Sequence, residues 1–122
     1  MSIKLPVLLV EDDGLIRMDL ADVLADSGFA VIEAANADEA LMELEKAPGV
    51  QALLTDIDMP GSMDGIALAK LTSARWTGCK IIVISGRYKP LDGTLPTGAR
   101  FLSKPVSEDQ LAATLHELEV TP

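Results

Sequence analysis

The sequence is poor in the residue types on which several kinds of site depend. Among its 122 residues there are one tryptophan, one tyrosine, two phenylalanines, one cysteine and one histidine. The single cysteine, Cys79, excludes an internal disulfide and a zinc site built from several cysteines, and it is typical of a reducing compartment. No apolar run approaches the ~18 residues of a membrane span, and the first residues lack the long apolar stretch of a signal peptide. We therefore expect a cytoplasmic protein without a membrane anchor.

Basic residues are also scarce. Lysine and arginine together number 10 against 19 acidic residues, which gives a net charge of −9 and argues against binding to nucleic acid or to an anionic membrane surface. The acidity is uneven, because residues 1–64 hold 14 acidic residues and three basic ones. Most of these acids have the spacing of solvated helix faces, but those that follow apolar runs need another explanation.

The apolar residues occur in short unbroken runs, and the chain length suits one domain, expected over residues 1–122. Runs without polar alternation are typical of strands that are covered on both faces, as in a parallel sheet. Helical apolar spacing lies between most of the runs, and two of the expected helices start with the spacing of a capping box, at Asn36 and Glu39 and at Ser107 and Gln110. The sequence therefore predicts an α/β fold with a doubly wound, five-stranded parallel sheet. The expected strands contain residues 7–10, 29–32, 52–54, 81–84 and 101–102. The expected helices contain residues 15–24, a segment that starts at Asn36 and stops before Pro48, about 65–73, and 108–118.

One segment breaks this alternation. Residues 86–98 contain Pro90, Gly93, Pro96 and Gly98 and have no helical apolar period. We expect a loop or one short turn at the place where a fourth helix would complete the pattern.

Polar side chains follow four of the five predicted strands. Glu11 and Asp12 follow the first, Asp56 follows the third, Ser85 ends the fourth, and Lys104 follows the last. The carboxyl ends of parallel strands share one edge of a sheet, where ligands bind in folds of this kind. If the first and third strands are neighbours, the three carboxylates converge on one pocket.

Three converging carboxylates need positive charge. Lys104 supplies one charge, and oxygen ligands without histidine or cysteine favour a hard cation such as Mg²⁺. An aspartate beside a metal and a lysine is a known nucleophile that forms an aspartyl-phosphate. Ser85 and Lys104 would bind the phosphoryl oxygens. The pattern predicts phosphoryl transfer onto Asp56.

With these residues in these positions, the sequence resembles the receiver domain of response regulators in two-component signalling. The resemblance covers the whole chain and includes five short motifs in the family's order. They are residues 8–13 (LLVEDD), 56–60 (DIDMP), 63–65 (MDG), 84–86 (ISG) and 104–105 (KP). The resemblance implies a flavodoxin-like sheet in the order 2-1-3-4-5, an order of which a chemotaxis receiver is a known example.

The resemblance assigns a role to each matching position. Asp56 is the implied phosphoacceptor, which takes its phosphoryl group from a histidine kinase or a histidine phosphotransfer protein. The implied Mg²⁺ site consists of Glu11, Asp12, Asp56 and the backbone carbonyl of Asp58.

The remaining implied roles concern the response to phosphorylation. Ser85 and Lys104 bind the phosphoryl group, and Phe101 occupies the aromatic switch position that moves with Ser85. The bond from Lys104 to Pro105 is expected to be cis, since an X–Pro bond lowers the cost of cis to ~0.5–1 kcal/mol. The output is implied to be binding to another protein, because nothing in the sequence points to a DNA-binding unit.

The chain departs from the family pattern at three places. Residues 61–63 include one residue more than the usual spacing, so we expect a reshaped loop beside Asp56. Phe101 has no hydroxyl, unlike the tyrosine that is common at its position. The family's usual fourth helix is replaced by the Pro/Gly-rich residues at about 87–99, so we expect an atypical output surface, to which Tyr88 could contribute.

Two other functions remain open at this stage. A receiver-like module could bind partners without being phosphorylated. Alternatively, Asp56 and Asp58 have the spacing of nucleophile and acid/base in a small Mg²⁺-dependent aspartyl phosphatase. We expect a phosphorylated switch and not a turnover enzyme, and the sequence does not separate a stand-alone receiver from one belonging to a hybrid kinase.

Overall fold

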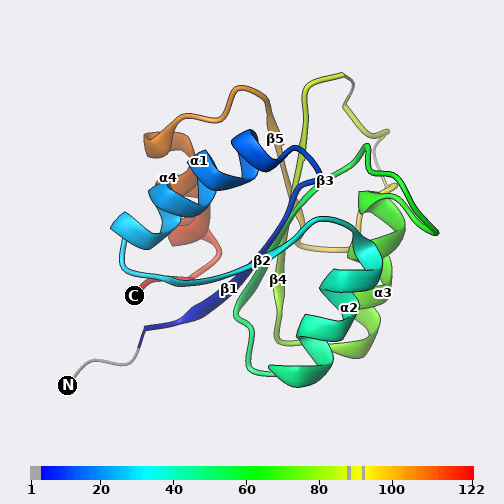
Figure 1. The fold of residues 1–122 in the computed structure, drawn as a ribbon, viewed down its shortest axis with the longest axis horizontal. Coiled ribbons are helices and arrows are strands. Elements are labelled where there is room, and N and C mark those ends of the chain that lie inside the picture. Colours follow the sequence, from blue (N-terminus) through cyan, green and yellow to red (C-terminus); the bar gives the residue numbers. More distant parts are fainter. Residues whose placement is uncertain (1–3, 88, 92) are drawn as a thin grey trace.

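The protein is built around one parallel sheet. The computed structural model describes residues 4–87, 89–91 and 93–122. Five strands lie in the order β2-β1-β3-β4-β5, all parallel, as the sequence and its family resemblance predict (Figure 1). The strands are β1 (Pro6–Val10), β2 (Ala30–Ala34), β3 (Ala52–Asp56), β4 (Lys80–Ser85) and β5 (Arg100–Ser103).

Each apolar run supplies both faces of the sheet, which explains the missing polar alternation. In β1, Val7 and Leu9 pack in one core cluster, while Leu8 and Val10 pack in the other. Successive side chains of a strand point to opposite faces, so a strand buried on both sides needs apolar residues throughout. The central strand β3 is buried along its whole length.

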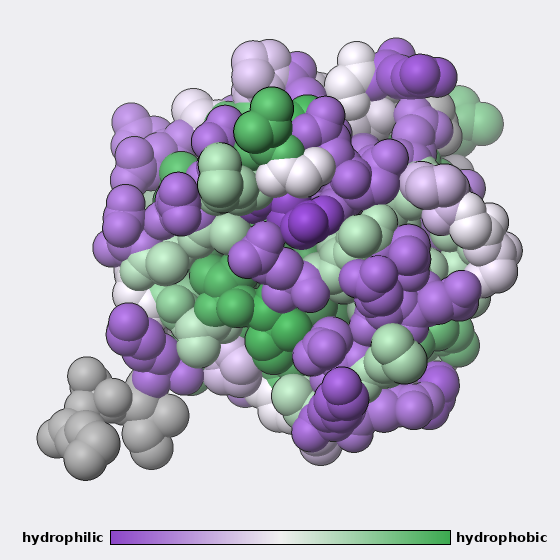
Figure 2. Space-filling model, in the orientation of Figure 1, coloured by the Kyte–Doolittle hydropathy of each residue, from purple (hydrophilic) through white to green (hydrophobic). Residues whose placement is uncertain are grey.

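Four helices within the described part of the chain cover the two faces of the sheet. Helices α1 and α4 contribute to the cluster of Val7 and Leu9, and helices α2 and α3 contribute to the cluster of Leu8 and Val10 (Figure 1). The edge strand β2 is less covered, and in Figure 2 hydrophobic colour reaches the surface around it, between hydrophilic residues. The helices are α1 (Gly14–Asp26), α2 (Ala37–Lys46), α3 (Gly65–Arg75) and α4 (Glu108–Glu117).

Side-chain caps start all four helices. Asp13, Asn36, Asp64 and Ser107 each accept a hydrogen bond from a backbone N–H of the first turn. The predicted capping box at Ser107 is complete. The one predicted at Asn36 is shifted by one residue, because the carboxylate of its partner in the helix accepts from the N–H of the preceding alanine.

The segment between β4 and β5 contains no helix among its described residues, as predicted. Leu95, Ala99 and the half-buried Phe101 each pack instead against the α2/α3 side of the core. Single loop residues thus cover this part of the core. Tyr88, which was considered as a contact for a partner, lies outside the described residues.

Nothing in the described ranges resembles a membrane span, since none of the helices there is both long enough and apolar enough.

Candidate functional site

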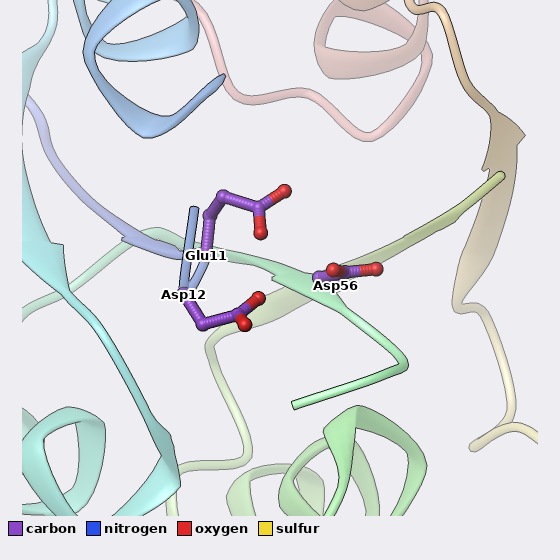
Figure 3. Close-up of side chains that lie close together, drawn as sticks. All are labelled: Glu11, Asp12 and Asp56. Carbon is purple, nitrogen blue, oxygen red and sulfur yellow. The ribbon is translucent and has the colours of Figure 1, made fainter. Parts of the chain in front are cut away.

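Three carboxylates meet at the carboxyl edge of the sheet. Glu11 and Asp12 follow β1, and Asp56 ends β3, which is the direct neighbour of β1. One oxygen of each side chain lies within 4.8 Å of the others, and Figure 3 shows the three side chains extending into the same space. The structure therefore brings together the carboxylates that the sequence predicts to converge.

Lys104 lies between two of these carboxylates. Its Nζ donates to Oε1 of Glu11 over 2.7 Å and to Oδ2 of Asp56 over 3.2 Å. Lys104 follows the last residue of β5, and its peptide bond to Pro105 is cis, as expected. Because Glu11 follows β1, Asp56 ends β3 and Lys104 follows β5, the one ammonium joins three strand ends at a single point.

The surroundings of Glu11 are unusual for a carboxylate. The residue is 1% exposed, and besides Lys104 its side chain accepts a hydrogen bond from the backbone N–H of Asp13 over 3.2 Å. A buried carboxylate is costly unless it is paired and hydrogen-bonded, and Glu11 is both. This pairing explains how an acid can lie at the bottom of the site.

The electrostatics of the site leave negative charge uncompensated. Burial, followed by a hydrogen bond to Glu11 and the charge of Glu11, raises the pKa of Asp12 above its usual value of 3.8. Burial alone would lower the pKa of Lys104, but the hydrogen bond to Glu11 and the charge of Asp56 outweigh it and raise that pKa. A cation would offset the charge of Glu11, which adds to the effect of burial on the pKa of Asp12.

The donor set fits Mg²⁺. All three groups are carboxylates, and neither histidine nor cysteine belongs to the cluster that the described residues form. Oxygen ligands of this kind select a hard divalent ion, and a partly open site with few protein ligands suits Mg²⁺, which keeps bound waters. Asp12 is exposed, so the cluster is accessible from solvent.

Ser85 and Asp58 lie beside the carboxylates but make other contacts. Ser85 ends β4 and is 2% exposed, and its hydroxyl oxygen accepts a hydrogen bond from the N–H of Arg87 over 3.2 Å. The side chain of Asp58 is not part of the carboxylate cluster. It forms an ion pair with Nε of Arg87 over 3.6 Å, which links the loops that follow β3 and β4.

The loop with the additional residue contacts a neighbouring helix. Gly61 has a positive φ of 113°, a conformation that glycine adopts without strain. The hydroxyl of Ser62 donates to Oδ1 of Asp38, at the start of α2, over 3.0 Å. The loop is thereby held toward α2.

Two residues near the site had no predicted role. Arg17 on α1 donates to the backbone carbonyl of Glu11 over 2.7 Å. Gly65 opens α3 so close to β3 that its N–H donates to the carbonyl of Ile57 over 2.9 Å. For Gly65 the MDG motif is a signal, but a side chain that reaches a backbone carbonyl, as Arg17 does, leaves no comparable pattern in the sequence.

The fold and site together define a doubly wound α/β domain with an acidic cluster and a lysine at the carboxyl edge of its sheet. Comparison with known proteins is consistent with this class. The response regulator receiver domain family matches residues 7–116, so the chain belongs to that family.

Curated relatives support the same assignment. The chain is 38% identical over 116 residues to the sensor kinase CckA of Brucella abortus (strain 2308), covering 92% of this chain and 12% of that protein. It is 30% identical over 117 residues to the transcriptional regulatory protein PdtaR of Mycobacterium tuberculosis (strain ATCC 25618 / H37Rv), covering 94% of this chain and 56% of PdtaR. The chain thus spans only part of the length of these relatives.

Solved structures agree with the fold. The crystal structure of the receiver domain from the hybrid histidine kinase CckA superposes with a TM-score of 0.79 at 32% identity, covering 93% of this chain and 97% of the other. A CheY-like receiver domain protein from Methanospirillum hungatei JF-1 gives a TM-score of 0.84 at 28% identity, covering 96% and 95%.

Proposed function

We propose that this receiver domain accepts a phosphoryl group on Asp56, with Mg²⁺ bound beside it, and signals by binding another protein. The donor would be a phosphohistidine on a histidine kinase or a histidine phosphotransfer protein. The observation that carries the proposal is the position of Lys104 Nζ between Glu11 and Asp56, within a cluster of three carboxylates.

In the proposed transfer, a carboxylate oxygen of Asp56 attacks the phosphorus. The new P–O bond forms as the P–N bond to the donor histidine breaks, and the electron pair of that bond stays on the imidazole. Lys104 already contacts Oδ2 of Asp56, so its ammonium is placed to offset charge on the incoming phosphoryl oxygens. Ser85, on the neighbouring strand, would supply a hydroxyl to the same group.

The proposed Mg²⁺ ligands are Glu11, Asp12, Asp56 and the backbone carbonyl of Asp58. When bound, the ion would neutralise charge on the phosphoryl oxygens during transfer. Phe101, half-buried beside the β4–β5 loop, is the proposed switch residue that follows a movement of Ser85. A change at this position would reach Leu95 and Ala99, which line one pocket with Phe101.

A receiver of this kind is a switch and not a turnover enzyme. Its partners would be proteins, in keeping with the net charge of −9, and the cytoplasm is the proposed compartment because the one cysteine is free and buried. The aspartyl phosphatase alternative needs Asp58 as an acid/base. The ion pair of Asp58 with Arg87 disfavours that role.

The test is incubation with acetyl phosphate and Mg²⁺, followed by intact-mass measurement. The wild-type chain should gain the mass of one phosphoryl group, and Asp56→Asn should not. Asp58→Asn is the matched control, since it lies two residues away and should still form the adduct. An adduct on Asp56→Asn, or none on the folded wild type, would refute the proposal.

A second measurement addresses the module that works without phosphorylation. A fluoride of beryllium with Mg²⁺ mimics the phosphorylated state, and amide NMR should report changes at Ser85 and Phe101. If neither resonance moves although Asp56 binds the mimic, the chain would be a receiver-like binding module without a switch.

A further inference from the structure

Arg17 contacts the acidic site through the backbone. Its Nη1 donates to the carbonyl oxygen of Glu11 over 2.7 Å, and its Nε pairs with Oε1 of Glu33 on β2 over 3.2 Å. The side chain of Arg17 is 24% exposed, so most of it is enclosed between α1 and the ends of the two strands. One guanidinium thus fixes a peptide of the site and anchors itself on the neighbouring strand.

The peptide that Arg17 holds is the one between Glu11 and Asp12. Its orientation sets the directions in which both carboxylates leave the backbone. On the other side, the N–H of Glu11 donates to the carbonyl of Ala34 over 3.1 Å. The backbone of Glu11 is therefore fixed at its N–H by β2 and at its carbonyl by Arg17.

We propose that Arg17 is a positioning residue for the divalent cation, holding the Glu11–Asp12 peptide so that both carboxylates face Asp56. This inference rests on the proposed function, because it takes the acidic cluster to be a Mg²⁺ site. Groups that orient metal ligands without touching the metal typically change metal affinity 10–100-fold when removed. Arg17 does this through a main-chain carbonyl.

An electrostatic role and a positioning role of Arg17 predict opposite changes in Mg²⁺ affinity when the side chain is replaced. As a cation near the acidic cluster, Arg17 opposes the binding of Mg²⁺, so a purely electrostatic role predicts tighter binding when its charge is removed. As a positioning residue it predicts weaker binding. Lysine keeps the charge but lacks the planar fork that serves two acceptors at once, so it should not replace arginine here.

The experiment is a Mg²⁺ titration of the metal-free chain followed in proton–nitrogen correlation spectra. The amide of Asp13 is the reporter, because it donates to the Glu11 carboxylate. We expect the dissociation constant to rise about tenfold in Arg17→Gln and in Arg17→Lys. Glu33→Gln, which removes only the anchor of the guanidinium, should give a smaller rise. The same spectra show whether each variant is folded.

The matched control is Arg75→Gln. Like Arg17, Arg75 lies on a helix and pairs with a glutamate of another element, in this case Glu45 of α2 over 3.4 Å. Arg75 touches no residue of the site, so its replacement should leave Mg²⁺ binding unchanged. Unchanged or tighter binding in folded Arg17→Gln and Arg17→Lys would overturn the inference and leave the proposed function intact. A wild-type chain that binds no Mg²⁺ would overturn both. If Arg17→Gln does not fold, the dissociation constants of Arg17→Lys and Glu33→Gln test the inference in its place.

Discussion

Gly65 lets the start of α3 lie very close to the backbone at the end of β3. A Cβ added there would lie 1.8 Å from the carbonyl oxygen of Asp56 and 2.9 Å from the Cα of Ile57. Both obstacles are backbone atoms, which cannot rotate away as a flexible side chain could. Gly65→Ala must therefore push α3 away from the end of β3.

The size of the effect follows from this geometry. Cβ contacts below 3.0 Å essentially do not occur, so α3 and the peptide after Asp56 must separate by at least about 1.2 Å. Overpacking of this kind costs typically 1–3 kcal/mol. The separation also strains the hydrogen bond from Gly65 N–H to Ile57, and such bonds contribute about 0.5–1.5 kcal/mol each. We expect Gly65→Ala to lower the free energy of unfolding by about 3 kcal/mol.

Urea denaturation with and without Mg²⁺ measures this loss. Gly14→Ala is the matched control, because Gly14 also opens a helix but has nothing within 4 Å of its added Cβ. Alanine there should leave the stability unchanged or raise it by about 0.4–1 kcal/mol. A Gly65→Ala chain as stable as Gly14→Ala would refute the reasoning, since it would mean that the added methyl group does not push α3 away from the Asp56 peptide.

Two further predictions concern the charges of the site. Because the pKa of Asp12 is raised in the folded state, ionised Asp12 disfavours the fold at neutral pH and this penalty disappears as the pH falls through that pKa. Without metal, Asp12→Asn should therefore have a higher urea midpoint than wild type at pH 7, and this gain should shrink toward pH 4. The control is Asp19→Asn, at an exposed position. A gain of Asp12→Asn that persists below pH 4 would contradict a raised pKa of Asp12 in the folded state. Lys104→Met leaves the buried Glu11 without its cation and should cost about 3 kcal/mol in EDTA, with part recovered in Mg²⁺. The exposed Lys80→Met is its control, and equal losses in the two variants would argue against the pairing.

The sequence predicted those parts of the fold that depend on burial and on chain order. Apolar runs such as residues 7–10 must lie between two layers, and β1 and β3 bring Glu11 and Asp56 together because parallel strands end at one edge. The loop at about 87–99 was also predictable, since its prolines and glycines prevent a helix. These features follow from local composition and one topological rule.

Contacts that depend on side-chain reach were not predictable. Arg17 lies in a helix whose pattern fixes only its apolar face, so its bond to the Glu11 carbonyl appears only in three dimensions. Likewise Asn36 was correctly predicted to start α2, but its partner carboxylate accepts one residue earlier than a capping box requires. Which atom each of these side chains reaches depends on three-dimensional packing, and the sequence alone does not show that packing.

The charge balance of the site indicates why a hydroxyl beside it matters. Three carboxylates with one ammonium carry excess negative charge, which a divalent cation could offset. Transfer onto Asp56 would exchange one carboxylate charge for a phosphoryl charge of about −1.5 to −2, so the balanced site would become more negative again. A neutral donor can then be drawn in, and Ser85 at the end of β4 carries one.

If the segment after Ser85 moved inward as the Ser85 hydroxyl donates toward Asp56, the hydrogen bond that the Ser85 oxygen accepts from Arg87 N–H would carry Arg87 with it. No helix among the described residues carries such a shift onward from β4. Leu95 and Ala99, which pack against the same core cluster as Phe101 and line one pocket with it, are the residues that would transmit it. The atypical loop would then be the part of the chain through which phosphorylation is read by a partner.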